Sequence, residues 1–219
     1  MKKVSLLLLS LFCFIVSSYS QLVLADRQQG QDIFPIVASA SNAVVCYDKS
    51  DAEVVKKSAK LFVEDVERVT GKRLKAKEKI SSDRNIVLVG TIGKNRYIDQ
   101  LVARNKLDIS QIKHGWEQYV ITIVNNPFAG VEKALVIAGC DRRGTSYGLF
   151  SISETIGVSP WYWWADAPVI KKKNLCLQVS PIVSKAPSIK YRGIFINDED
   201  WGLKPWASKT FEPETGDIG

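Results

Sequence analysis

The sequence predicts an α/β protein: a two-layer α/β domain, with a mixed sheet and two main helices on one face, followed by the first strand of a truncated (β/α)8 barrel. Apolar runs ended by glycine, at 85–90 and 134–139, predict buried strands. Apolar residues at helical spacing, at 52–70 and 144–156, predict the two helices. The barrel strand is predicted at 194–196, where an apolar run leads into an amide and three carboxylates.

The first half of the domain is expected to alternate between strands and a helix. Short β-branched segments predict strands at 33–38 and 43–47. The helix over 52–70 is expected to end at Gly71, because glycine adopts the left-handed conformation that closes a helix. The apolar run at 85–90 then predicts a strand buried on both faces.

The second half repeats this alternation. A short helix is expected at 98–104, a β-branched strand at 118–124 and a buried strand at 134–139. The second main helix covers 144–156. A proline-rich connection without periodicity follows, and it contains one short strand at 174–179.

The N-terminus has the pattern of a signal peptide. Lys2 and Lys3 form a positive start, an apolar run covers 4–16, and Ser18 and Ser20 are small residues of the kind that a signal peptidase recognises. The apolar run is short for a bilayer span, so cleavage is favoured over an uncleaved anchor. The sequence therefore predicts export to the periplasm or the cell exterior, with no membrane contact after cleavage.

Three segments follow from these patterns. Residues 1–20 form the signal peptide, residues 21–180 the N-terminal two-layer α/β domain, and residues 181–219 a linker and the start of a catalytic (β/α)8 barrel. A complete barrel usually needs about 250 residues. The barrel is therefore expected to be truncated.

The charge of the chain argues against a nucleic-acid partner. The net charge is +7, and the basic residues are densest at 72–79 and 171–173. Neither patch is interleaved with aromatic residues or accompanied by a nucleic-acid-binding motif. We therefore expect no nucleic acid among the partners.

Cysteine and histidine are too sparse for a metal or nucleophile site. Cleavage of the signal peptide leaves Cys46, Cys140 and Cys176, an odd number that cannot all pair, and the first two lie in apolar strand contexts. The single histidine, His114, has no metal-ligand spacing near it. We therefore expect no metal, no cofactor and no Ser-His or Cys-His nucleophile.

A turn between a predicted strand and the second main helix carries Arg142 and Arg143. Free N–H groups at a helix start, together with two guanidinium groups, favour recognition of an acidic group. The same turn also suits a capped helix start, in which Asp141 or Thr145 accepts backbone hydrogens and the arginines lie in solvent. The pattern favours the cap, and both interpretations stay open.

An aromatic segment follows the second main helix. Residues 161–164 comprise three tryptophans, among them Trp164, and one tyrosine, and Asp166 comes two residues later. Flat indole rings stack on sugar rings at little entropic cost. The segment therefore suits either a carbohydrate contact or an apolar plug at a domain interface.

The predicted barrel strand ends in Asn197, Asp198, Glu199 and Asp200. Carboxylates at the exit of a barrel strand are candidates for chemistry. A glycosidase needs two carboxyl groups about 5–10 Å apart, which neighbours on one strand end rarely provide. One of these groups suits a contact to a sugar hydroxyl, and the alternative is a polar loop with a helix cap.

Three stretches together resemble a known family. They are DRRGTSYG at 141–148, GVSPWYWWAD at 157–166 and KYRGIFINDE at 190–199. Their order and spacing are similar to the N-terminal region of glycoside hydrolase family 115, the xylan α-1,2-glucuronidases. The second string is highly specific, the third is nearly so, and the likeness extends over almost the whole mature chain.

The resemblance implies a leading two-layer domain, a (β/α)8 barrel, and C-terminal domains that help the full-length protein to form a homodimer. It implies an inverting release of glucuronic acid, or its 4-O-methyl ether, from glucuronoxylan or its oligosaccharides. The catalytic acid and base are implied to lie on later barrel strands beyond Gly219, which would leave the 219-residue fragment inactive.

The resemblance also implies substrate-binding residues. Asp198 and Glu199, beside Asn197, match the end of the first barrel strand, where family members place a carboxylate in the substrate pocket. Trp164 and Asp166 fall in the matching aromatic loop. The motif also matches Arg142 and Arg143, without giving them a defined role.

Two other functions remain as alternatives. One is a stand-alone carbohydrate-binding module that uses the aromatic segment at 161–164. The other is a generic α/β ligand-binding domain without a sugar role, which only the glycine-ended strands support.

Overall fold

A computed structural model describes residues 22–162, 165–193 and 195 of the chain. The chain divides into two compact units, Met1–Ala186 and Pro187–Gly219. The second unit contains the predicted barrel strand, of which only residue 195 belongs to the described part. The elements below all belong to the first unit.

The main sheet has six strands in the order β4-β3-β5-β7-β6-β9. Strands β4, β3, β5 and β7 are parallel, while β6 runs antiparallel to both β7 and β9. In the register of the central pair, Val87 lies opposite Leu135. The strands are β3 (Val44–Cys46), β4 (Lys75–Lys77), β5 (Asn85–Thr91), β6 (Tyr119–Asn125), β7 (Lys133–Gly139) and β9 (Ile182–Val183).

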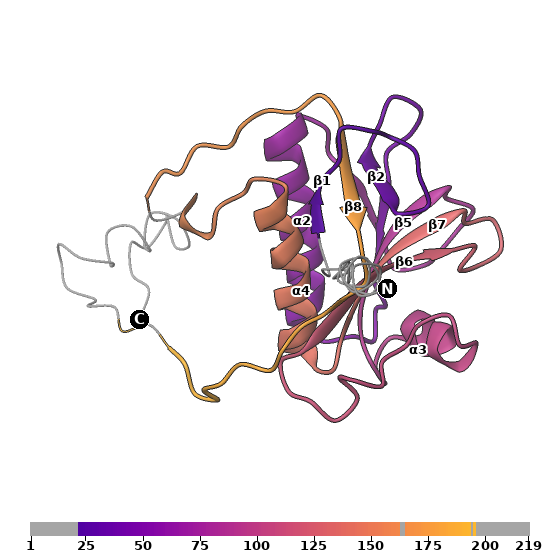
Figure 1. Ribbon diagram of the computed structural model, residues 1–219, viewed down its shortest axis with the longest axis vertical. Coiled ribbons are helices and arrows are strands. Elements are labelled where there is room, and N and C mark those ends of the chain that lie inside the picture. Colours follow the sequence, from indigo (N-terminus) through magenta and orange to yellow (C-terminus); the bar gives the residue numbers. More distant parts are fainter. Residues whose placement is uncertain (1–21, 163–164, 194, 196–219) are drawn as a thin grey trace, which may run out of the picture. The chain divides into compact units, whose positions relative to one another are not determined.

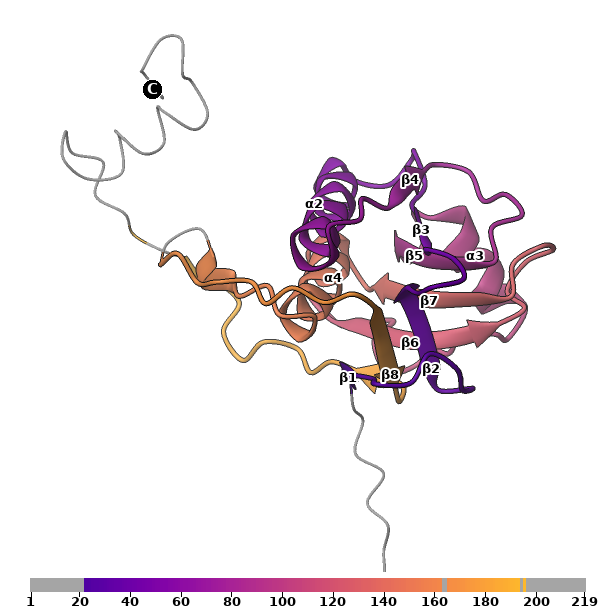
Figure 2. The ribbon, with the colours of Figure 1, turned by 90° about the horizontal axis from the view of Figure 1, so that it is seen from above.

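The two long helices, α2 (Glu53–Thr70) and α4 (Arg142–Thr155), lie side by side on one face of this sheet (Figure 1). The short helix α3 (Arg96–Ala103) covers the opposite face (Figure 2). Helix α2 ends as the sequence predicts, at Gly71, which has φ 72° and donates its N–H to the Glu67 carbonyl at 2.7 Å. No helix in the described part of the chain is both long and apolar enough to cross a bilayer.

The strands divide their side chains between two cores, because successive residues of a strand point to opposite faces. In β5, Val87 and Val89 face α2 and α4, while Ile86 and Leu88 face α3. Strands buried on both faces need continuous apolar runs, and this explains the uninterrupted hydrophobicity of β5 and β7.

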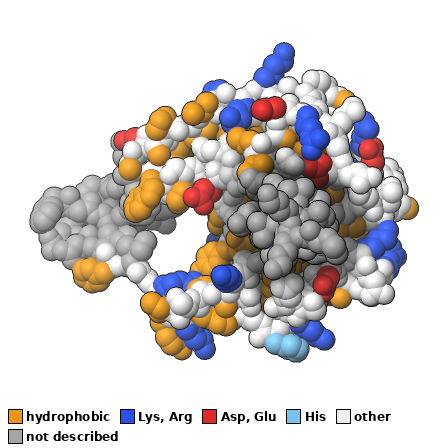
Figure 3. All heavy atoms as spheres, viewed as in Figure 1, with side chains coloured by type: hydrophobic (Ala, Val, Ile, Leu, Met, Phe, Trp, Pro, Cys, Tyr) orange, Lys and Arg blue, Asp and Glu red, His pale blue; other side chains and the backbone are white. Residues whose placement is uncertain are grey.

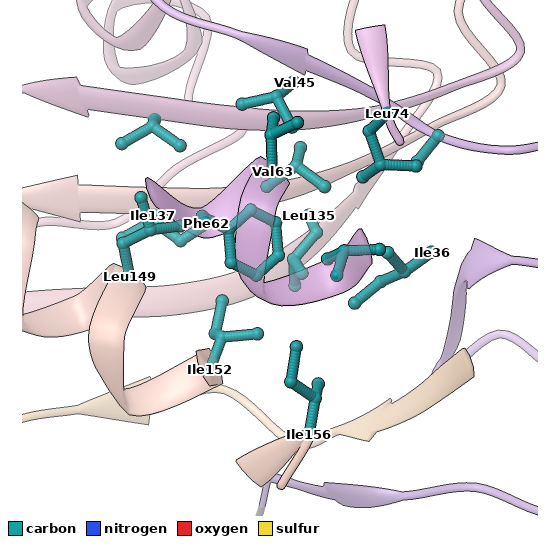
Figure 4. Packing of buried hydrophobic residues seen from close by; sticks show 14 of the residues in the cluster. Ile36, Val45, Phe62, Val63, Leu74, Leu135, Ile137, Leu149, Ile152 and Ile156 are labelled. Carbon is teal, nitrogen blue, oxygen red and sulfur yellow. The ribbon is translucent and has the colours of Figure 1, made fainter. Parts of the chain in front are cut away.

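The larger core is centred on Phe62 of α2, which is fully buried. Figure 4 shows its ring between the sheet residues Leu135 and Ile137 and the α4 residues Leu149 and Ile152. The two helices also meet through a buried hydrogen bond between the hydroxyls of Ser58 and Ser146, at 3.0 Å.

A second, three-stranded antiparallel sheet has the order β1-β8-β2 and contributes to the same core. Its strands are β1 (Leu22–Leu24), β2 (Ile33–Val37) and β8 (Leu175–Val179). Strand β8 therefore returns from late in the chain to lie between two early strands, with Leu177 opposite both Leu24 and Phe34.

The predicted fold class is confirmed as α/β with the two main helices on one face, but it was incomplete in two respects. The sequence predicted one sheet covered on one face, whereas the structure has two sheets, and α3 covers the other face of the main one. The predicted strands at 33–38 and 174–179 pair with each other and not with the main sheet.

Basic side chains are scattered over the face seen in Figure 3, where they stand singly or in small groups among acidic and apolar ones.

Candidate functional site

The described residues form a crevice at the carboxyl edge of the parallel strands. After β3 the chain turns into α2, after β5 into α3 on the opposite face, and after β7 into α4 on the same face as α2. Open α/β sheets bind ligands where neighbouring strands send their connections to opposite faces. This carboxyl-edge crevice has a volume of about 520 Å³ and is lined by Ser50, Asp51, Ala52, Thr91, Ile92, Lys94, Cys140, Asp141 and Arg142.

The side chains of Asp51, which is buried, and Ser50, which is exposed, tie the loops of the crevice together. One oxygen of Asp51 accepts the Thr91 N–H at 2.7 Å, and the other accepts the Ala52 N–H at 2.8 Å. The Ser50 hydroxyl donates to the Lys94 carbonyl at 3.1 Å. The contacts with Thr91 and Lys94 join residues 40 and 44 positions apart, so the loop after β3 is held to the loop after β5.

Asp48 also anchors the loop after β3. Its carboxylate accepts the N–H and the hydroxyl of Ser50, at 3.0 and 2.9 Å, and lies 3.2 Å from Nε of Arg96. Burial of the carboxyl opposes ionisation, but the Ser50 hydrogen bonds and the Arg96 charge outweigh it and hold the pKa of Asp48 below its ordinary 3.8.

We expect Asp48→Asn to destabilise the protein by about 2 kcal/mol at pH 7, because charge-assisted hydrogen bonds are lost. A lowered folded-state pKa stabilises the protein above the unfolded pKa of about 3.9 and ceases to do so as pH falls through the folded value. The difference between wild type and variant should therefore shrink between pH 5 and 3, as measured by urea unfolding. Asp26→Asn, at an exposed residue, is the control and should show no such change.

The start of α4 is capped by the protein itself. Asp141 accepts the N–H groups of Arg143 and Gly144, at 3.0 and 2.8 Å, and the N–H of Glu117 at 2.7 Å. The cap that the sequence favoured at this turn is thus confirmed for Asp141. The hydroxyl of Thr145 instead lies 3.0 Å from that of Thr91, in the buried interior.

The two arginines of this turn have different surroundings. Arg143 pairs with the buried carboxylate of Glu117 at 2.8 Å, so its charge is already engaged. Arg142 is exposed and lines the carboxyl-edge crevice, and it has no ion-pair partner among the described residues. The structure therefore separates two residues that the sequence grouped together.

The three cysteines of the described chain are all free thiols. Burial, the charge of Asp83 and, in the opposite direction, that of Lys77 set the pKa of Cys46 at about 12. Burial likewise raises the pKa of Cys140, whose sulfur accepts the Gln118 N–H at 3.3 Å. Raised pKa values disfavour the thiolate, so neither sulfur is an activated nucleophile. Within the described ranges, no group of three His, Cys, Asp or Glu residues is placed to hold a metal ion.

Most of the predicted substrate-binding residues lie outside the described ranges, namely Trp164, Asn197, Asp198 and Glu199. Asp166 is exposed and has a left-handed backbone, with φ 48°. Its place on the surface leaves its predicted role untested.

The two aromatic residues of the segment that the structure describes differ in their exposure to solvent. Trp161 is 64% exposed, in a short 3-10 helix, Pro160–Tyr162, whereas Tyr162 packs on the larger core. The Arg68 guanidinium stacks over the Tyr162 ring at 5.1 Å, and this fastens the segment to the C-terminal end of α2. Of the described residues of the segment, Tyr162 therefore belongs to the core and Trp161 is an exposed aromatic residue, and both predicted roles of the segment stay predictions.

Arg142 and the described residues of the aromatic segment lie at opposite ends of α4. Arg142 is the first residue of α4, and the segment follows the last turn of that helix. Helix α4 has 14 residues, which corresponds to a length of about 20 Å. The described chain thus has two separate candidate surfaces, one at each end of α4.

Sequence reasoning missed Asp51, Thr91 and Lys94 as parts of one site. The only available signals were the helix-capping residues around Asp51 and the glycine-rich turn 90–93 after a strand. These segments are brought together by the parallel pairing of β3 with β5, which the sequence does not specify.

Comparison with known proteins gives one family match. The model of glycosyl hydrolase family 115 matches residues 184–218. This segment contains the whole KYRGIFINDE string at 190–199, including Asn197, Asp198 and Glu199. None of the curated proteins that were compared matches the chain.

Two solved structures are similar. BtGH115A, a family GH115 4-O-methyl-alpha-glucuronidase with specificity for decorated arabinogalactans, is 34% identical with a TM-score of 0.64, over 84% of this chain and 22% of its own. CpGH84D is 13% identical with a TM-score of 0.43, over 73% of this chain and 22% of its own, and it carries no argument. The present chain thus spans about a fifth of the length of either structure.

Proposed function

Because the chain is a relative of the family 115 glycosyl hydrolases, we propose that it is the leading part of a longer, exported enzyme that releases glucuronic acid or its 4-O-methyl ether from a decorated polysaccharide. The observation that carries this proposal is the 34% identity over 84% of the chain with a 4-O-methyl-alpha-glucuronidase. The family match at 184–218 supports it independently of the α/β domain.

The chemistry is proposed to lie outside this chain. An inverting glycosidase needs a protonated and an ionised carboxyl group about 6.5–9.5 Å apart on either side of the sugar. The buried carboxylates of the described residues are engaged by loop N–H groups or by arginine, as shown for Asp48, Asp51 and Glu117. They hold the fold together and are not available for proton transfer to a substrate.

Asn197, Asp198 and Glu199 are proposed to hold the sugar, and the first barrel strand is proposed to present them. This proposal is supported by the family match at 184–218, which contains all three residues. Trp164 and Asp166 are also proposed to contact a glycan, and the support is that Trp161 of the same aromatic segment is exposed.

We propose that the enzyme recognises the uronic acid more than the polysaccharide backbone. The sequence resemblance points to glucuronoxylan, whereas BtGH115A is specific for decorated arabinogalactans. What these substrates share is a glucuronic acid substituent. Export and a homodimeric full-length protein belong to the same proposal.

We expect the enzyme that contains this chain to release glucuronic acid or 4-O-methylglucuronic acid from at least one of the two polysaccharides. Glucuronoxylan and glucuronate-decorated arabinogalactan are assayed in parallel, with chromatographic detection of the uronic acid, and with BtGH115A as the positive control. Release from neither substrate would contradict the proposed function, and the relative rates on the two would identify the preferred backbone.

A further inference from the structure

We infer that the carboxyl-edge crevice binds a small molecule that carries a carboxylate or phosphate group. The inference stands on the cavity and on the charges that line it. It does not depend on the activity proposed for the longer enzyme, because the crevice lies at the opposite end of α4 from the aromatic segment.

The size and position of the crevice suit a ligand. Its volume of about 520 Å³ lies within the roughly 300–1,000 Å³ of ordinary small-molecule sites. It lies at the carboxyl ends of β3, β5 and β7, where connections leave to both faces of the sheet. Open α/β sheets place their ligand sites at this point.

Two carboxylates, Asp51 and Asp141, and two cations, Lys94 and Arg142, line the crevice. The carboxylates of Asp51 and Asp141 accept five backbone N–H groups within the loops, so their lone pairs are largely occupied although their negative charges remain. Lys94 and Arg142 are exposed, and neither has an ion-pair partner in the part of the chain that the structure describes. A ligand entering the crevice therefore meets two exposed cations that form no ion pair with a described residue, whereas the carboxylate oxygens already accept loop N–H groups.

The crevice is also organised before a ligand arrives. In addition to the contacts of Asp51 and Ser50, the Ile92 N–H donates to the Gly139 carbonyl at 3.0 Å and joins the loop after β5 to the end of β7. Loops that are already fixed lose little entropy on binding. The ordering cost of binding then falls mainly on the exposed side chains of Lys94 and Arg142.

An oxyanion is the chemistry that this lining recognises. A guanidinium forms two parallel hydrogen bonds with a carboxylate or phosphate, and an ammonium adds a point charge beside it. Ile92 and Ala52 supply a small apolar wall. A neutral sugar lacks the group that Lys94 and Arg142 would neutralise.

The test is a titration of the 219-residue chain, followed by amide NMR shifts at constant ionic strength. Sodium D-glucuronate and sodium phosphate are the two probes, and D-glucose is the neutral comparison. We expect saturable shifts at Thr91, Lys94 and Arg142 with at least one of the anions and none with glucose. The response to each anion shows whether the preferred group is a carboxylate or a phosphate.

Charge-matched variants make the test specific. The double variant Lys94→Gln/Arg142→Gln should weaken anion binding at least about tenfold, since charge-assisted hydrogen bonds are lost. Lys57→Gln/Arg104→Gln removes the same charge from exposed positions outside the crevice and should change affinity less than about twofold. Absence of saturable shifts, equal shifts with glucose, or equal weakening in both double variants would overturn the inference.

Discussion

Replacement of Phe62 by alanine should destabilise the protein by about 3–5 kcal/mol, as measured by urea unfolding followed by circular dichroism. The ring is fully buried between the main sheet and α4, so its removal leaves a cavity that the strands cannot close (Figure 4). Since single domains are stable by only about 5–15 kcal/mol, this loss takes a large part of the total.

Phe150→Ala is the matched control. This phenylalanine lies on α4 but is 39% exposed, so truncation should cost about 1 kcal/mol or less, in proportion to the smaller apolar area buried. Equal losses for the two variants would show that Phe62 is not at the centre of the core.

Gly144→Ala should destabilise the protein by about 2 kcal/mol, although alanine favours a helix by about 1 kcal/mol over glycine. The reason is a close approach: a Cβ at this position would overlap the carbonyl oxygen of Gln118 and lie 3.0 Å from its backbone nitrogen and carbonyl carbon. Backbone atoms cannot rotate away as a side chain does, so α4 would have to move off the start of β6.

The sign of the stability change in Gly144→Ala distinguishes the close contact with Gln118 from the effect of helix propensity. If the first turn of α4 did not contact Gln118, Gly144→Ala would stabilise the protein, and thermal unfolding would show a higher midpoint. Ser151→Ala, in the same helix, changes propensity without such a contact and should stay within about 0.5 kcal/mol of wild type.

The amphipathic elements could be predicted well from the sequence because their signals are local. Helix α2 begins within one residue of the prediction and ends at Gly71, since the apolar spacing and the glycine stop both lie in the segment itself. Helix α4 begins two residues earlier than predicted, because Asp141 and not Gly144 marks its start.

The missed elements depend on partners that are distant in the sequence. Strand β4 is Lys-Ala-Lys, which has no apolar pattern, and it forms only by pairing with β3. Strands β1 and β9 are similarly short and lie at sheet edges. The second sheet exists because β8 returns between β1 and β2, about 140 residues after Phe34, and no local pattern encodes that pairing.

The candidate site could be predicted only in part, for the same reason. Arg142 was identified from the turn motif, but its separation from Arg143 depends on Glu117, which reaches Arg143 from the segment before β6. Lys94 became a candidate only because the pairing of β5 with β7 brings it to the same crevice as Arg142. The barrel residues Asp198 and Glu199 were recognised from a motif, and their role stays a prediction.

The central claim, that this chain is the leading part of a glucuronidase whose catalytic acid and base lie elsewhere, is tested most directly by assaying the 219-residue chain alone. Glucuronoxylan and decorated arabinogalactan are incubated with the purified chain and, separately, with BtGH115A at equal molar concentration. We predict uronic acid release by BtGH115A from decorated arabinogalactan and none by the chain above a protein-free blank. Release by the chain at a rate comparable to that of BtGH115A would contradict the claim.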